Sequence, residues 1–244
     1  MLDKKKFYIN GKWVPPFKKN DFEVINPSSE EVFAIISLGR KEDVNIAVKA
    51  AKDAFGNWKD TKKEERIIFL EKLLKIYKKR FNEMAEAMSK EMGAPIDYAT
   101  TVHASSGQSH IEDFILRLKN FKFEESFDSK SNNHIAHEPI GVCGLITPWN
   151  WPINQIALKV IPALATGCTM ILKPSEISPI SAMLFAEMID EAGFPAGVFN
   201  LVNGDGDGVG TQISSHPNID MISFTGSTRA GKLITKNAAN TIKR

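Results

Sequence analysis

The sequence has 244 residues, of which 43% are hydrophobic and 25% charged, and its 31 basic and 29 acidic residues leave a net charge of +2. A chain of this length can bury a substantial core. The near balance of charge speaks against a dedicated nucleic-acid or membrane-surface binder, which needs concentrated basic charge. No apolar run approaches the roughly 20 residues that span a bilayer, and no apolar segment follows the basic N-terminus, as a secretory signal requires.

The first 120 residues predict a hairpin followed by helices. Asn10-Gly11 separates two short apolar runs over 7–14, which is a strong hairpin signal because both residues tolerate positive φ. Apolar residues at helical spacing then predict a helix from about Val44 to Phe55, with Asp43 placed to cap it. A second helix is expected to begin at a capping box, Thr61-x-x-Glu64.

This second helix continues with apolar residues at helical spacing as far as Met88, and Gly93 and Pro95 are expected to end it. A third helix is predicted over about 98–119. Residues 121–138 alternate weakly around a polar tip and predict a protruding hairpin. His134 and His137 lie in this segment, but no third ligand is near them, so we expect no metal site there.

The pattern changes at residue 139, where short β-rich runs begin to alternate with helical segments. The runs are Ile140–Thr147, Thr169–Lys173, Val198–Val202 and Met221–Thr225, and the helices are expected over 153–166 and 179–192, ending at Gly167 and Gly193. Such alternation predicts an α/β fold, a Rossmann-like parallel sheet with helices on both faces. We therefore divide the chain into 1–120, the hairpin at 121–138, and 139–244.

Polar or glycine-rich segments follow each of the four predicted strands, and ligands bind at this edge of a parallel sheet. Gly226-x-x-x-x-Gly231-Lys232 resembles a phosphate-binding P-loop, but Leu233 stands where Mg²⁺ coordination needs Ser or Thr. The segment from Asn203 to Gly208 imitates half of a calcium-binding loop. Its twelfth position is Ser214, which cannot supply the required carboxylate.

The segments TPWNWP, KPSE, FPAGVFNLVNG and FTGSTRAG, in this order and spacing, resemble the signature series of the NAD(P)-dependent aldehyde dehydrogenase superfamily. The N-terminal INGKW and INPSSEEV agree with it, so the resemblance covers essentially the whole chain. It implies the cofactor-binding half of that fold, with the catalytic domain absent, and an oligomerisation hairpin at 121–138.

The resemblance also implies roles for eight residues. Asn150 would be the amide donor of the oxyanion hole. Lys173 and Glu176 would hold the adenosine ribose, and the carboxylate favours NAD over NADP because it would repel a 2′-phosphate. From the residues alone, these two could instead form a surface ion pair. The remaining cofactor contacts would come from Thr147, Trp149, Gly206, Gly226 and Ser227.

The family's oxidation needs a cysteine nucleophile and a glutamate base, and neither motif is present in these 244 residues. Cys143 and Cys168 lie in apolar runs, so we expect both thiols to be reduced and inert, with raised pKa values, in a cytoplasmic chain.

The expected function is NAD-dependent oxidation of a small aldehyde to an acid by a longer parent, with this chain as its cofactor-binding half. The alternative is a stand-alone dinucleotide-binding or assembly module. Because the last predicted strand would be an exposed edge, we expect a homo-oligomer or a complementing second half.

Overall fold

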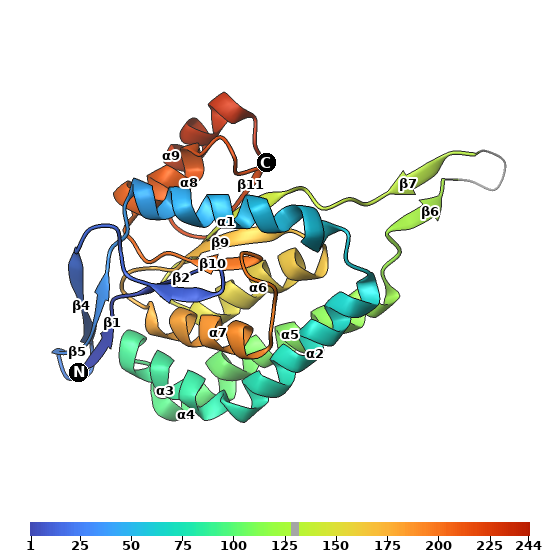
Figure 1. Cartoon of the computed structure of the whole chain (residues 1–244). Helices are drawn as coiled ribbons and strands as arrows, with labels where there is room; N and C mark the ends of the chain where they lie inside the picture. Colours follow the sequence, from blue (N-terminus) through green and yellow to red (C-terminus); the bar gives the residue numbers. More distant parts are fainter. Residues whose placement is uncertain (128–131) are drawn as a thin grey trace.

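A six-stranded sheet forms the centre of the molecule in the computed structural model, which describes residues 1–127 and 132–244 (Figure 1). The strand order is β11-β8-β9-β10-β2-β3. These strands are β2 (Phe7–Ile9), β3 (Lys12–Val14), β8 (Val142–Ile146), β9 (Thr169–Lys173), β10 (Phe199–Leu201) and β11 (Met221–Phe224). The expected sheet is therefore present, with its four predicted strands mutually parallel and adjacent.

The sheet is mixed and not purely parallel, because the N-terminal hairpin joins it. Tyr8 of β2 pairs antiparallel with Leu201 of β10, and β3 pairs with β2 at the outer edge. Side chains of the central strands are buried on both faces. Leu145 of β8 belongs to one core, and its neighbour Ile146 belongs to the core on the opposite face. This alternation explains why the strands read as continuous apolar runs.

Helices cover both faces of the sheet (Figure 1). On one face α1 crosses β8, β9 and β10, with α8 beside it; on the other lie α6 and α7, with α2 and α5 packed against them. Their bounds are α1 (Lys41–Lys59), α2 (Lys63–Lys79), α3 (Phe81–Met92), α5 (Ser105–Asn120), α6 (Pro152–Ala165), α7 (Ile180–Glu191), α8 (Thr211–Ser215) and α9 (Thr228–Ala238). No helix in the described ranges is long and apolar enough to cross a membrane.

Two smaller sheets lie outside this centre. The N-terminal one has the order β1-β5-β4, from β1 (Leu2–Lys4), β4 (Asp21–Asn26) and β5 (Glu31–Ser37). The predicted hairpin at 121–138 is present as an antiparallel pair, β6 (Glu124–Ser126) and β7 (His134–Ala136), which projects far from the body (Figure 1). Most of its predicted polar tip, residues 128–131, lies outside the described residues.

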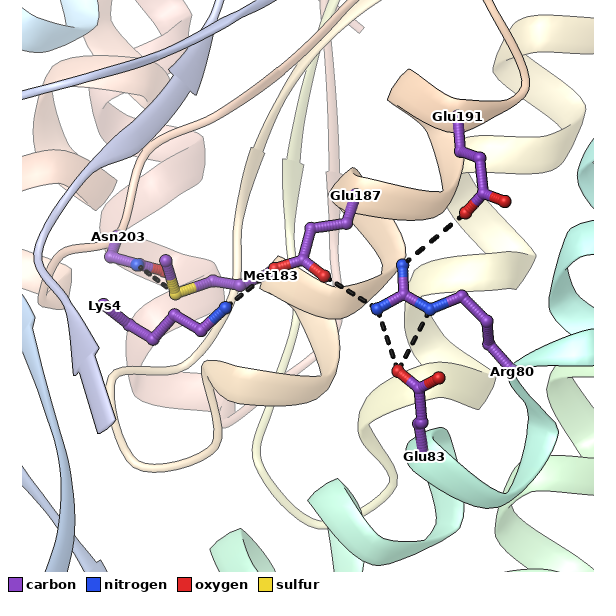
Figure 2. A network of polar contacts seen from close by, with 7 residues as sticks. All are labelled: Lys4, Arg80, Glu83, Met183, Glu187, Glu191 and Asn203. Atoms are coloured by element: carbon purple, nitrogen blue, oxygen red, sulfur yellow. Dashed lines mark hydrogen bonds and ion pairs between the residues drawn. The ribbon is translucent and has the colours of Figure 1, made fainter. Parts of the chain in front are cut away.

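A polar network connects β1 to α7 and to the junction of α2 and α3 (Figure 2). Lys4 Nζ lies 2.7 Å from a carboxylate oxygen of Glu187 on α7, and the other oxygen of Glu187 accepts from Arg80 at 2.8 Å. Arg80, at the junction of α2 and α3, also pairs with Glu83 at 2.9 Å. The network thus joins the N-terminal strand, α7 and the α2–α3 junction.

Asp43 caps α1 as predicted, but from inside the helix. It is the third residue of α1, and its carboxylate accepts from the N–H of the N-cap residue Arg40 at 2.8 Å. Thr61 does not cap α2, which begins at Lys63, because its hydroxyl donates to Trp58 O and accepts from Arg66 Nε. The predicted cap at Thr61 was therefore wrong, because hydrogen bonds with nearby residues use its hydroxyl instead.

The helix predicted from 61 towards Gly93 is divided in two at Arg80, whose φ of −102° and ψ of 19° are not helical. The segment predicted over 98–119 is also less regular than expected. It consists of α4 (Ile96–Tyr98), a π-helical stretch η1 (Ala99–Ala104) and α5. The glycine stops are confirmed, because Gly93, Gly167 and Gly193 all have positive φ at helix ends.

Candidate functional site

The segments that follow β8, β9, β10 and β11 meet at one edge of the sheet and enclose a cleft of about 520 Å³. Because the four strands are parallel, their carboxyl ends lie together, as the sequence predicts. The cleft brings together seven of the eight predicted site residues: Thr147, Trp149, Lys173, Glu176, Gly206, Gly226 and Ser227. The eighth, Asn150, is exposed and lies outside the lining, just before α6.

Lys173 and Glu176 form an ion pair at the floor of the cleft. Lys173 Nζ lies 3.3 Å from Glu176 Oε2 and donates to Pro174 O at 2.8 Å. The Lys173 side chain is 5% exposed and that of Glu176 is 27% exposed, so this pair is not the surface ion pair that the residues alone allowed. Burial lowers the pKa of Lys173, and Glu176 opposes this effect. A buried ammonium beside a partly exposed carboxylate can offer a ligand hydroxyl both a donor and an acceptor.

Thr147 and Trp149 line the cleft from the segment after β8. The Thr147 N–H donates to Lys173 O at 3.2 Å, which fixes this segment against the end of β9. The Thr147 hydroxyl is buried and has no partner among the described residues. Because a buried unpaired hydroxyl is costly, this oxygen is a candidate for contact with a ligand or a water molecule. The Trp149 side chain is 51% exposed and packs only partly against the protein.

The N-terminus of α9 faces the same cleft. Ser227 is the N-cap, and its hydroxyl accepts from Ala230 N at 3.3 Å. A Cβ on Gly226 would lie 2.5 Å from the ring of Phe224, so a larger residue there would have to displace this ring. The free amides at the start of a helix, together with its dipole, favour an anionic ligand. The remaining α9 lining is partly apolar, from Leu233 and Ile234.

The glycine-rich segment after β10 is held by Asp205, whose Oδ1 accepts from Gly208 N at 2.6 Å. This hydrogen bond caps a short π-helical turn and uses the carboxylate that a calcium loop would need. A Cβ at Gly206 would meet no protein atom within 4 Å. The protein itself therefore does not require glycine at 206, and close approach of a ligand stays a prediction.

Lys159 was missed by sequence reasoning. It lies on α6, and its ammonium donates to Thr225 Oγ1 at 2.7 Å, which joins α6 to the segment after β11. Burial lowers the pKa of Lys159. The available signal was a lysine in a largely apolar helix (INQIALKVIPALA), which suggests a partner for the charge but does not identify it.

Trp151, interpreted as a core aromatic, is partly buried and packs edge-to-face on His103, with ring centroids 5.5 Å apart. His134 lies 3.5 Å from Glu124 across the β6–β7 hairpin, and His137 packs on Phe121. No group of three or more potential metal ligands is found in the described part of the chain.

The two cysteines are both buried and unbridged, as expected, but they differ from each other. The pKa of Cys143 is raised, by the neighbouring Cys168 and by burial. The expectation was wrong for Cys168, whose pKa is lowered to about 6, chiefly by the Cys143 thiol. Hydrogen-bond donors around the Cys168 sulfur outweigh its burial, which sequence patterning could not reveal.

Comparison with known proteins gives consistent matches along the chain. The model of the aldehyde dehydrogenase family matches residues 13–244. The chain is 51% identical to a 3-succinoylsemialdehyde-pyridine dehydrogenase of Pseudomonas sp, covering 100% of this chain and 51% of that protein. It is 44% identical to a putative aldehyde dehydrogenase of Staphylococcus aureus, with the same coverage of 100% and 51%. The chain therefore spans about half the length of these curated relatives.

Solved structures of aldehyde dehydrogenases are also similar to this chain. An aldehyde dehydrogenase from Bartonella henselae has 57% identity and a TM-score of 0.99, over 100% of this chain and 52% of that one. Aldehyde dehydrogenase C of Pseudomonas syringae, a mutant in complex with NAD+ and octanal, has 46% identity and a TM-score of 0.95, over 98% and 49%. An NAD+ complex of the Bacillus cereus enzyme has 35% identity and a TM-score of 0.94, over 99% and 50%.

Proposed function

The chain belongs to the aldehyde dehydrogenase family, and on this premise we propose that it is the NAD-binding half of an enzyme that oxidises an aldehyde to a carboxylic acid. The observation that carries the proposal is the cleft at the carboxyl ends of the parallel strands, where Lys173, Glu176 and the N-terminus of α9 lie together. Solved relatives hold NAD+, and the lining of the cleft fits such a ligand.

Each part of the cleft fits one part of the cofactor. Lys173 and Glu176 would bind the adenosine ribose hydroxyls, as donor and acceptor. The carboxylate would repel a 2′-phosphate, so NAD is preferred to NADP. The amides at the start of α9, after Gly226 and Ser227, would bind the pyrophosphate. The unpaired Thr147 hydroxyl, Trp149 and the open space at Gly206 would complete the contacts.

Bound NAD would accept the hydride from the substrate. We assign Asn150, exposed beside this cleft, to the oxyanion hole. A neutral amide aimed at a developing oxyanion stabilises it by about 3–4 kcal/mol in acyl-transfer enzymes. The chain spans about half the length of its curated relatives, so we propose that the nucleophilic cysteine and the base belong to a second half of the fold, which turnover then requires. The aldehyde itself is then selected largely by that half.

We further propose that the chain works in the cytoplasm as an oligomer or with a complementing second half. The projecting β6–β7 hairpin exposes Phe127 and Ile135, at 65% and 39%, where a neighbouring subunit could cover them. Strand β11 is the outer strand of the sheet, and among the described residues only the backbone of Arg244 hydrogen-bonds along its outer edge. The alternative is a dinucleotide-binding or assembly module that acts without catalysis.

The test is calorimetric titration of the 244-residue chain with NAD and, separately, NADP. We expect saturable binding of NAD and weaker binding of NADP. Lys173→Met should weaken NAD binding at least about tenfold, because it removes a charged hydrogen-bond donor worth roughly 1.5–3 kcal/mol. Lys75→Met, an exposed lysine of α2, is the matched control and should bind as the wild type does. Absence of NAD binding at millimolar concentration, or equal effects of the two variants, would overturn the assignment of this cleft.

A further inference from the structure

A second groove lies between α1 and the turn that follows α8, and its volume is about 620 Å³. The two helices α1 and α8 pack side by side on one face of the sheet (Figure 1). Gln212 and Ser215 of α8 line this groove, whereas Thr211 and Ser214 of the same helix line the cleft described above. The two sites share no lining residue, so the groove is a separate feature of the surface.

The side of α1 that borders the groove carries three exposed lysines, Lys41, Lys49 and Lys52, and we call this site the basic groove. Lys41 and Lys52 lie about three turns apart, on the order of 16 Å along the helix axis. Lys49 forms an ion pair with Asp53, which also lines the groove. In the described part of the chain, no carboxylate forms an ion pair with Lys41 or Lys52. Both of these ammonium groups are therefore available to a ligand.

The turn after α8 holds two ammonium groups in place. Lys52 Nζ donates to Asn218 Oδ1 at 3.0 Å, and Lys243 Nζ, from the C-terminal segment, donates to His216 O at 2.6 Å. An ammonium has three N–H donors, so each of these lysines keeps donors for a ligand. Because the hydrogen bonds already restrict both side chains, a ligand would lose less affinity to ordering them.

His216 adds a neutral hydrogen-bond donor to the basic groove, which it lines. Its Nδ1 accepts from Asn218 N at 3.1 Å, so the proton of the neutral ring is on Nε2. The pKa of His216 is lowered by burial and by the charges of Lys243, Lys41 and Lys52. The ring therefore stays a neutral N–H donor at pH 7, and three ammonium groups from two segments of the chain act on it.

Two carboxylates offset part of this positive charge. Asp53 is used by its ion pair with Lys49. Asp220, which precedes β11, interacts with the charge of Lys243, but its Oδ2 accepts from Val142 N at 2.8 Å and so serves the sheet. The lysines around the basic groove therefore outnumber the carboxylates that face them, and the field at the groove favours an anion.

We propose that the basic groove binds a chain of two or more phosphate groups, carried by a free polyphosphate or by a nucleotide. Lysine ammonium groups bind phosphate oxygens as point charges, and their spread along α1 suits an elongated anion better than a single phosphate. The described residues that line the groove include no Phe, Tyr or Trp on which a base could stack. The groove therefore recognises the phosphate chain, and this site is additional to the proposed NAD cleft.

The first test follows the ring resonance of His216 by NMR while tripolyphosphate is added to the 244-residue chain at low ionic strength; the resonance is assigned by its loss in His216→Gln. We expect a saturable shift and a rise in the pKa of His216, because the bound anion offsets the lysine charges that lower it. Sodium chloride should weaken the binding, since the lysines are exposed. Sulfate at the same ionic strength is the control and should shift the resonance far less.

Variants separate the basic groove from attraction to the molecule as a whole. Lys41→Met and Lys52→Met should each weaken tripolyphosphate binding by about two- to fivefold, the range expected for one exposed charge. Lys59→Met is the matched control, because Lys59 is an exposed lysine of the same helix outside the groove lining. It should bind tripolyphosphate as the wild type does.

A titration with ATP distinguishes the two sources of the phosphate chain. It is made in Lys173→Met, which weakens the proposed adenosine site, and ATP should shift the His216 resonance with an affinity similar to that of tripolyphosphate. The proposal is overturned if millimolar tripolyphosphate leaves the His216 resonance unmoved, if sulfate shifts it equally, if only ATP shifts it, or if Lys59→Met weakens binding as much as Lys52→Met.

Discussion

Glu91 shows how strongly burial can act on a single carboxylate. It lies on α3, is 1% exposed, and accepts hydrogen bonds from Ile180 N at 2.6 Å, Ser181 N at 3.2 Å and the Ser181 hydroxyl. These donors begin α7, so Glu91 caps that helix from another element. Burial raises the pKa of Glu91 to about 7, although the hydrogen bonds from Ser181 and Ile180 oppose it. The carboxyl group therefore titrates near neutral pH.

The sign of the resulting pH dependence follows from linkage. A carboxyl whose pKa is higher in the folded than in the unfolded chain stabilises the fold fully below the unfolded value of 4.5, and this stabilisation is lost as the pH rises through about 7. We expect Glu91→Gln to remove this loss, which is on the order of 3 kcal/mol. Urea unfolding between pH 4.5 and 8 measures it.

The matched control for Glu91 is Glu86→Gln, an exposed acid on the same helix, which should follow the wild-type pH profile. A constant difference between Glu91→Gln and the wild type from pH 4.5 to 8 would contradict the prediction. It would show that the glutamate acts only as a hydrogen-bond acceptor for α7, and not as a titrating group.

At the scale of the elements, the side chain of Arg66 contacts the C-terminal ends of two helices, α1 and α6. Arg66, which is 5% exposed, donates to Lys59 O and Thr61 O at 2.8 Å each, beside the end of α1, and to Ala165 O at 3.3 Å at the end of α6. A cation at the C-termini of two helices satisfies free carbonyls and interacts favourably with both dipoles. Gly167, with φ of 84°, leaves room for the guanidinium, which a Cβ there would approach within 2.8 Å.

Arg66→Met should lower the free energy of unfolding by about 3 kcal/mol, because it leaves several buried acceptors unpaired. Arg66→Lys should recover only part of this, since one ammonium cannot reach carbonyls in three directions. Chemical denaturation of both variants gives the comparison. Equal stability of Arg66→Lys and the wild type would show that charge alone matters and that the fork of the guanidinium does not.

The elements also show which structural features the sequence could predict. The bounds of β9 were predicted because a largely apolar run lies between Gly167 and Pro174, and the meeting of seven site residues was predicted because parallel strands share an edge. The contacts of Arg66 and Lys159 could not be predicted, since each side chain donates a hydrogen bond to a residue far away in the sequence.

At the scale of the whole molecule, the network of Figure 2 determines how firmly the N-terminal strand is attached. Burial alone would raise the pKa of Glu187, but hydrogen bonds from Lys4 and Arg80 lower it overall. A lowered pKa means that the carboxylate contributes stability above about pH 4.5, which is lost as the pH falls through the folded value. The attachment of β1 should therefore weaken in acid.

Glu187→Gln should reproduce this weakening at neutral pH, with a loss of about 1 kcal/mol and faster hydrogen exchange at residues 2–6. Glu191→Gln is the matched control on the same helix. Its carboxylate lies 3.9 Å from Arg80, and no ion pair links it to Lys4. Hydrogen exchange followed by mass spectrometry compares the two. If both variants accelerate exchange equally at residues 2–6, the Lys4–Glu187 pair is not what holds the strand.

The pairing of β2 with β10 has a consequence for how this molecule is made. Tyr8 aligns with Leu201 and donates to Asp190 at 2.7 Å, so the hairpin that begins the chain finds its partners about 180 residues later. Closing so long a loop is entropically unfavourable and occurs late. On the ribosome, the first strands must therefore wait, unpaired, until nearly the whole of this sequence has emerged. Changes at the β2–β10 contact should accelerate unfolding more than they slow folding.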